Sequence, residues 1–131
     1  MHFYRAIIFA PPHAQLLINH QKRMNVRAKH FPNILNQQLL LVQDKKAFGL
    51  IKITKIVPIT SLHQFLSLYP LHKISEKERK DWWKKIPTKK HPFYGYIIQI
   101  IKKFPKPVQV DWIQGPRIFI KPDNITFKKL N

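Results

Sequence analysis

Prolines divide this chain into short segments and limit where its strands and helices can begin and end. The sequence has 11 prolines in 131 residues. A proline rarely continues a helix or a central strand, because it has no amide hydrogen to donate. Pro11 and Pro12 follow an apolar run, Pro58 follows an alternating run, and Pro87 follows a helical pattern. The segments between them suit one α+β domain covering residues 1–131, with a peripheral tail at 122–131.

Most apolar segments have the character of β-strands. His2–Ala10 and Phe93–Ile101 are rich in aromatic and β-branched residues, which predicts buried strands. Gln38–Gln43 and Leu50–Val57 predict a β-hairpin closed by Pro58. Further extended segments are expected at Lys22–Lys29, at Val108–Trp112 and Arg117–Lys121 around a turn, and at Ile125–Phe127. Five or six strands in a small, partly closed barrel would leave few exposed sheet edges.

Two or three helices should flank that barrel. A short helix is expected over residues 14–18, and an amphipathic one over Ser61–Leu68. Ser75–Glu78 has the Ser-x-x-Glu pattern of a capping box, which predicts a helix reaching to about Lys85. Negative charge is favourable in the first turn of a helix. We therefore interpret three acids as capping and dipole residues, namely Glu76, Glu78 and Asp81.

The charge balance points to a polyanionic partner. The chain has 24 Lys and Arg residues against 6 acidic residues, which gives a formal net charge of +18. Lys and Arg bind phosphates by releasing counterions, and aromatic side chains stack on unpaired bases. We therefore expect a nucleic-acid-binding module that favours RNA over DNA. An acidic protein or a ribonucleoprotein particle is the alternative partner that this charge would suit.

A basic segment after the first predicted helix is the sharpest candidate site. Lys22, Asn25 and Arg27 converge if this segment is extended, and Lys and Arg together suit a phosphate or a base edge. A second basic and aromatic region lies between residues 82 and 94. The candidate nucleic-acid-binding residues are Lys22, Arg23, Asn25, Arg27, Lys29, Trp82, Lys84, Lys85, Lys89, Lys90 and Tyr94.

Other chemistries find little support in the sequence. The chain has no cysteine, so it has no disulfide and no thiol nucleophile. Its histidines lack metal-ligand spacing, and three glycines cannot form a phosphate loop, so we expect no metal and no cofactor. Gly49 and Gly115 are expected in turns, and Gly95 at a bulge or a close approach. A metal-independent nuclease that uses His20 or His30 with Lys22 stays open.

The chain also lacks the patterns of a membrane protein or a secreted one. No apolar run approaches the roughly 20 residues that a membrane-spanning helix needs. The apolar N-terminal stretch is followed by a proline pair and has no small-residue cleavage site. We expect a cytoplasmic protein.

The basic segment resembles the signature of the ASCH family, which is part of the PUA-like superfold. That signature reads Gly-x-Lys-x-x-Glu/Thr-x-Arg after the first helix. Lys22 and Arg27 match it, whereas His20 stands in place of the Gly and Asn25 in place of the Glu or Thr. FGLIKITKIVPI and YGYIIQI also resemble strands of the family, so the similarity covers about residues 3–121. The resemblance implies a small barrel with a cleft beside the first helix.

The resemblance implies either binding or hydrolysis. ASCH-like proteins include RNA- or DNA-binding modules, some with ribonuclease activity, and small amidohydrolases that deacetylate acetylcytidine. The amidohydrolases use the signature Lys, the Thr three residues later, and a carboxylate from after the central strands. Here Asn25 replaces the Thr, and residues 59–69 contain no Asp or Glu. We therefore favour a binding module. The alternative is a metal-independent nuclease or an amidohydrolase-like nucleoside-modifying enzyme, with Lys22 as its candidate catalytic residue.

Overall fold

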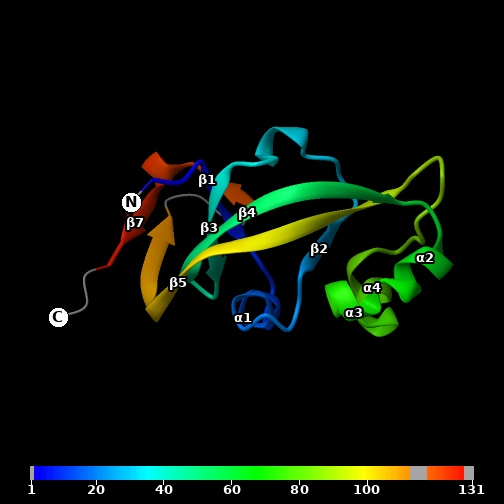
Figure 1. Ribbon diagram of the computed structural model, residues 1–131, viewed down its shortest axis with the longest axis horizontal. Helices are drawn as coiled ribbons and strands as arrows, with labels where there is room; N and C mark the ends of the chain where they lie inside the picture. The colour runs from blue at the N-terminus through cyan, green and yellow to red at the C-terminus, as the bar shows by residue number, and fades with distance from the viewer. Residues whose placement is uncertain (1, 113–117, 129–131) are drawn as a thin grey trace.

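A computed structural model describes residues 2–112 and 118–128 of the chain. One mixed sheet curls into half a barrel, and most of the helices lie at one end of it (Figure 1). The strands are β1 (Arg5–Ile8), β2 (Met24–Arg27), β3 (Gln38–Gln43), β4 (Lys46–Ile59), β5 (Phe93–Trp112), β6 (Phe119–Ile120) and β7 (Ile125–Phe127). The helices are α1 (His13–Ile18), α2 (Leu62–Ser67), α3 (Tyr69–His72) and α4 (Glu76–Trp82), with 3-10 turns at Pro32–Ile34 and Pro122–Asn124.

The long β4–β5 ribbon is the centre of the sheet. The strand order is β2-β5-β4-β3-β1-β6, and β7 pairs with the far end of β5. β1 runs parallel to β3, and the other pairs are antiparallel. Leu17 and Ile18 of α1 pack with Ile7, Leu41 and Ile51 in the core that the curled sheet encloses. The expected α+β architecture with a partly closed barrel is confirmed, although the structure describes seven strands rather than five or six.

The observed strands differ from the expected ones mainly near prolines. β5 is one strand of 20 residues that passes through Pro105 and Pro107, and β4 continues past Pro58 to Ile59. The register moves from Gly49↔Lys103 to Ala47↔Val108, so several β5 residues bulge out of the ladder at the two prolines. A bulged residue needs no ladder hydrogen bond, and proline is therefore tolerated there.

Gly49 and Gly95 lie in the β4–β5 ribbon where other parts of the chain approach them closely. The hairpin turn is Asp44–Lys45, where both residues have positive φ, so the prediction that Gly49 lies in a turn is wrong. Gly49 lies within β4, where a Cβ atom would collide with the backbone oxygen of Lys102. At Gly95 a Cβ atom would lie 2.7 Å from the Met24 sulfur, which confirms a close approach. The predicted turn at Gly115 lies outside the described residues.

α2 and α4 begin at the predicted caps but are shorter than expected, whereas α1 begins one residue earlier than predicted. Ser61 caps α2, and the capping box between Ser75 and Glu78 is present at the start of α4. α4 ends at Trp82 rather than near Lys85, because Trp83 takes an extended backbone and packs against Phe93. Within the described residues, no helix is long and apolar enough to cross a membrane.

Candidate functional site

The two ends of the curled sheet face each other without pairing. β2 forms one end, and β1 with β6 forms the other. The Arg27 guanidinium bridges this gap by donating from Nη2 to the backbone oxygen of Ile8 at 3.0 Å. A cavity of about 390 Å³ opens along the gap, and we call it the seam pocket. Its lining residues are Phe9, Ala10, His13, Asn25, Val26, Arg27, Ala28, Lys29, Phe31, Trp82, Trp83 and Ile118.

The seam pocket combines aromatic walls with buried polar donors. Asn25 is only 5% exposed, and both its Nδ2 atom and Nε of Arg27 have no hydrogen-bond partner among the described residues. Buried polar groups without partners are costly, so such groups in a pocket indicate a place where a ligand or water binds. Burial lowers the pKa of Arg27 to about 10, so the guanidinium stays charged at neutral pH. The pocket therefore offers neutral and cationic donors beside apolar surfaces.

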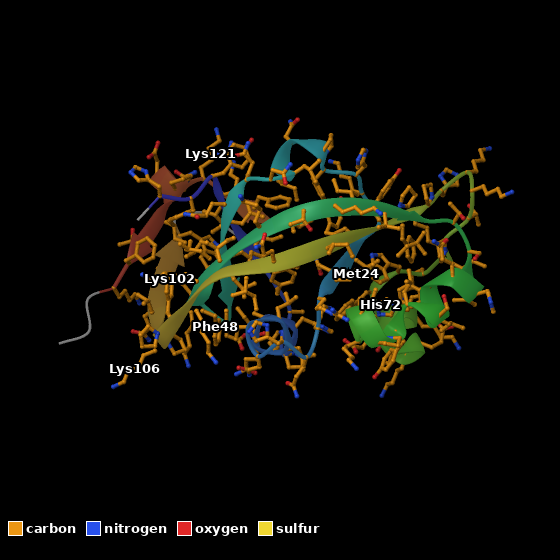
Figure 2. All side chains as sticks on the ribbon, in the orientation of Figure 1. Met24, Phe48, His72, Lys102, Lys106 and Lys121 are labelled. Atoms are coloured by element: carbon orange, nitrogen blue, oxygen red, sulfur yellow. The ribbon has the colours of Figure 1, made fainter. Side chains whose placement is uncertain are left out.

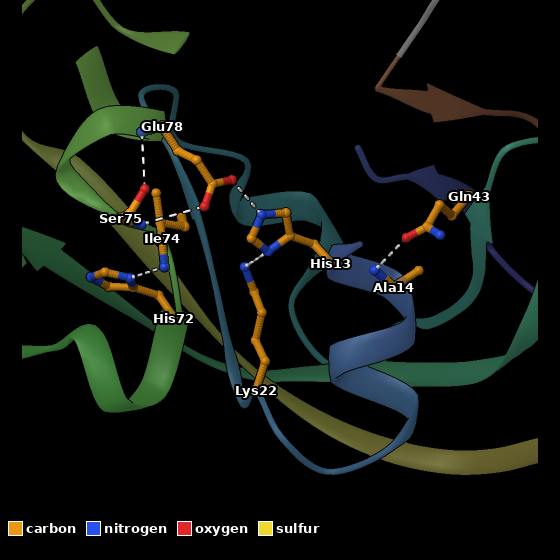
Figure 3. Close-up of polar contacts among 8 residues, drawn as sticks. All are labelled: His13, Ala14, Lys22, Gln43, His72, Ile74, Ser75 and Glu78. Atoms are coloured by element: carbon orange, nitrogen blue, oxygen red, sulfur yellow. Dashed lines mark hydrogen bonds and ion pairs between the residues drawn. The ribbon is translucent and has the colours of Figure 1, made fainter. Parts of the chain in front are cut away.

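A hydrogen-bond chain of Lys22, His13 and Glu78 joins the seam pocket at His13, and Figure 3 shows its contacts. Lys22 Nζ lies 2.8 Å from Nδ1 of His13, and His13 Nε2 lies 2.9 Å from Oε2 of Glu78. An ammonium can only donate, so Nδ1 accepts and Nε2 carries the hydrogen that it donates to Glu78. His13 is the member of this chain that lines the pocket, whereas Lys22 is 2% exposed and lies beneath it.

Burial lowers the pKa values of the two basic side chains in this hydrogen-bond chain. Desolvation, with a smaller contribution from the charge of Arg27, lowers the pKa of Lys22 to about 7 against the opposing charge of Glu78. Desolvation and the charge of Lys22 also lower the pKa of His13, which keeps its imidazole neutral. Burial of Glu78 acts to raise its pKa, but the hydrogen bond from His13 and the bond from Ser75 lower it overall. Near neutral pH, Lys22 is thus the group that exchanges a proton most readily.

Glu78 brings a carboxylate to the site from outside residues 59–69, which contain no Asp or Glu. It contacts His13 rather than Lys22. The capping box uses Oε1 of Glu78, and its Oε2 remains free to accept the hydrogen bond from His13. A residue interpreted as a helix cap therefore also supplies a carboxylate to the site. Asn25 still stands where the amidohydrolases have Thr.

The remaining candidate residues are spread over three places. Trp82 is 42% exposed, lines the seam pocket, and meets the His13 ring edge-on at 5.2 Å. Lys84 and Lys85 line a basic depression next to the seam pocket. Trp83 lines both the depression and the seam pocket. Arg23, Lys89, Lys90 and Tyr94 lie outside both linings, and Tyr94 stacks on His30 instead.

Phe9, His13, Phe31 and Glu78 belong to the site but were not singled out as binding residues. His13 begins α1 directly after the proline pair, among residues that pack in the core. Nothing in its sequence neighbourhood distinguishes it from an ordinary helix residue. Phe9 and Phe31 look like core residues, and they reach the pocket only because the two sheet ends face each other.

The positive charge is not confined to the seam pocket. Lys102, Lys106 and Lys121 lie at the end of the molecule away from α2, α3 and α4 (Figure 2). Within residues 2–112 and 118–128, only Lys45 and Arg79 among the Lys and Arg residues pair with a carboxylate. Most of the positive charge therefore remains available to a polyanion.

Comparison with solved structures identifies the fold. The crystal structure of ASCH from Zymomonas mobilis matches 96% of this chain and 87% of that chain, with a TM-score of 0.60 and 13% identity. A serine-to-alanine mutant of that protein matches 96% and 88%, with a TM-score of 0.62 and 14% identity. A tyrosine-to-phenylalanine mutant matches 98% and 91%, with a TM-score of 0.60 and 13% identity. Neither the family models nor the curated proteins give a match.

These likenesses define the class of fold. The chain has the PUA-like fold of ASCH-domain proteins over nearly its whole described length. The resemblance to ASCH-domain proteins is thereby confirmed at the level of the fold.

Proposed function

We propose that the protein binds single-stranded nucleic acid, RNA in preference to DNA, and takes one unpaired base into the seam pocket. The observation that carries this proposal is the pair of buried, unpartnered donors on Asn25 and Arg27 beneath aromatic walls. A volume of about 390 Å³ falls within the range of small-molecule sites. The largely unpaired surface charge supplies affinity for the phosphate backbone.

The pocket favours an unpaired base over a duplex. A base must leave its stack to enter a recessed pocket, and single strands allow this at little cost. Asn25 and Arg27 are two residues apart on β2, so their side chains share one face of the strand. Two donors side by side fit a base edge that presents two acceptors, such as O2 and N3 of cytosine. Trp82 is exposed enough to stack on the same base.

Fluorescence anisotropy with a labelled 12-nucleotide single-stranded RNA tests the proposal. Asn25→Ala should weaken binding about tenfold, by loss of a base-reading donor. The matched control is Lys106→Gln, which removes a charge at the far end of β5 and should weaken binding less than threefold. Affinity should also fall steeply with added salt. Binding that is flat in salt, or equally insensitive to both variants, would contradict the proposal.

Hydrolysis is the second candidate function. The observation that favours it is the Glu78–His13–Lys22 chain, in which a lysine with a pKa of about 7 contacts a histidine that lines the pocket. A group with a pKa near the working pH is suited to general acid–base chemistry. Purified protein should then cleave RNA or deacylate an acylated nucleoside, and His13→Ala should abolish turnover while the RNA still binds. Turnover that survives both His13→Ala and Lys22→Met would contradict this candidate.

A further inference from the structure

We infer that the site reads two consecutive nucleotides, with the Phe31 ring standing between their bases and Lys29 binding the phosphate that joins them. This inference rests on the proposed function and adds the length of the ligand to it. A second cavity of about 230 Å³, which we call the outer pocket, is lined by Tyr4, Arg5, His30, Phe31, Pro32, Asn33, Ile34 and Phe119. Phe31 lines both this pocket and the seam pocket.

The two pockets are neighbours on either side of one short segment. Lys29 lines the seam pocket, His30 lines the outer pocket, and Phe31 lines both. Two neighbouring residues on the opposite side of the gap also line different pockets. Ile118 lines the seam pocket, and Phe119 lines the outer pocket. Phe119 meets Phe31 edge-on at 4.9 Å, so these rings form the partition between the pockets. Two bases on either side of Phe31 would be unstacked from each other, which a single strand permits.

The outer pocket has its own surfaces for a base. The Arg5 guanidinium lies 4.3 Å from the centroid of the Tyr4 ring, and its Nη1 donates to the backbone oxygen of Tyr4. The His30 ring is stacked on Tyr94 with a centroid separation of 4.8 Å, which makes a supported flat surface. The side chain of Asn33 is exposed at the rim and can donate to or accept from a base edge.

The Phe31 partition is held in place by a buried tyrosine. The Tyr96 hydroxyl accepts a hydrogen bond from the Phe31 amide at 2.9 Å and donates one to the Lys29 backbone oxygen at 2.6 Å. Tyr96 is 1% exposed, and burial raises its pKa to about 12, so it keeps the proton that it donates. Tyr96 therefore holds both ends of the segment from Lys29 to Phe31. A site ordered before binding loses less entropy when the ligand arrives.

Lys29 is placed for the linking phosphate. Its Nζ atom lies 5.5 Å from the centroid of the Phe31 ring, directly beside the partition. The phosphate that joins two nucleotides lies between their bases, so bases in the two pockets would bring it to this position. Lys29 is exposed and has no carboxylate partner among the described residues. Its ammonium is thus free to bind an anion.

Calorimetric titration with a nucleotide length series tests the inference. For each of the four bases, the probes are the nucleoside 5′-monophosphate, the 5′-phosphorylated dinucleotide and the corresponding trinucleotide. For the preferred base, the dinucleotide should bind at least tenfold more tightly than the monophosphate, and the trinucleotide less than threefold more tightly than the dinucleotide. Lys29→Gln should reduce the first gain to under threefold, because the dinucleotide then loses the contact to its linking phosphate. Lys106→Gln, the matched control, should leave the whole series unchanged.

Three further variants separate the partition from the fold. Phe31→Leu should remove the dinucleotide gain, and His30→Ala, which changes an exposed residue of the outer pocket, should reduce it. Tyr96→Phe tests positioning, because it should weaken dinucleotide binding more than monophosphate binding. Equal gains at each added nucleotide, or a dinucleotide gain untouched by Lys29→Gln and His30→Ala, would overturn the inference while the proposed function stands. Failure of every probe to bind would instead remove the proposed function itself.

Discussion

The ammonium of Lys22 lies 2.8 Å from Nδ1 of His13, so a buried lysine donates to an imidazole whose other nitrogen is engaged with Glu78. This relationship couples the segment after α1 to the first turn of α4, about 55 residues later in the chain. It also places a group that titrates near pH 7 directly behind the seam pocket.

Replacing Lys22 should change how stability depends on pH. The lysine loses its proton near pH 7 in the folded protein and only near 10.5 in the unfolded chain. Between these values the unfolded state binds more protons, so the free energy of unfolding should rise with pH. In urea titrations from pH 7 to 9, the wild-type value should rise by roughly 1.4 kcal/mol per pH unit at most. Lys22→Met should show a flatter profile, and parallel profiles would contradict the pKa assignment.

Replacing Asn25 by an apolar residue should preserve or raise the stability of the protein but weaken its binding of RNA. The side-chain Nδ2 atom of Asn25 is buried without a hydrogen-bond partner among the described residues. An unpartnered buried polar group costs about 1–3 kcal/mol of stability. Asn25→Val places a strand-favouring residue in β2 and removes that cost. Thermal unfolding should therefore occur at the same or a higher temperature, while RNA affinity falls. A clear loss of stability would show that Asn25 has a structural role instead.

Of the two glycines that the structure describes, Gly49 should tolerate substitution less. A Cβ atom at this position would collide with the Lys102 backbone within the β4–β5 ribbon, and backbone cannot move aside as a side chain can. Gly49→Ala should destabilise the protein by about 3 kcal/mol in urea unfolding. Gly95→Ala is the control, because its added Cβ meets only the flexible Met24 side chain and should cost about 1 kcal/mol. Equal losses would contradict this account of the ribbon.

The sequence predicts the fold well where local chemistry decides it. The Ser75–Glu78 capping box begins α4, and the apolar runs of β3 and β4 form the expected hairpin. The length of β5 is decided by strand pairing, because Pro105 and Pro107 lie in a bulge that the sequence of one strand cannot reveal. β5 is consequently one long strand rather than two.

The candidate site is predicted only in part. Asn25 and Arg27 line the seam pocket together, as their spacing on one strand predicts, whereas Lys22 lies outside that lining and contacts His13 instead. His13 and Glu78 join them through contacts between residues 65 positions apart in the chain, for which no local pattern exists. The seam pocket itself depends on how far the sheet curls, which only the complete pairing of strands determines.

Photocrosslinking tests most directly whether an unpaired base enters the seam pocket. A single-stranded RNA carrying 4-thiouridine at each position in turn is irradiated in complex with the protein, and the crosslinked peptides are identified by mass spectrometry. We predict crosslinks on Trp82, Trp83 or Phe31, with loss of these crosslinks in Asn25→Ala. Crosslinks confined to Trp112 and the lysine-rich far end of β5, unchanged in Asn25→Ala, would contradict the account.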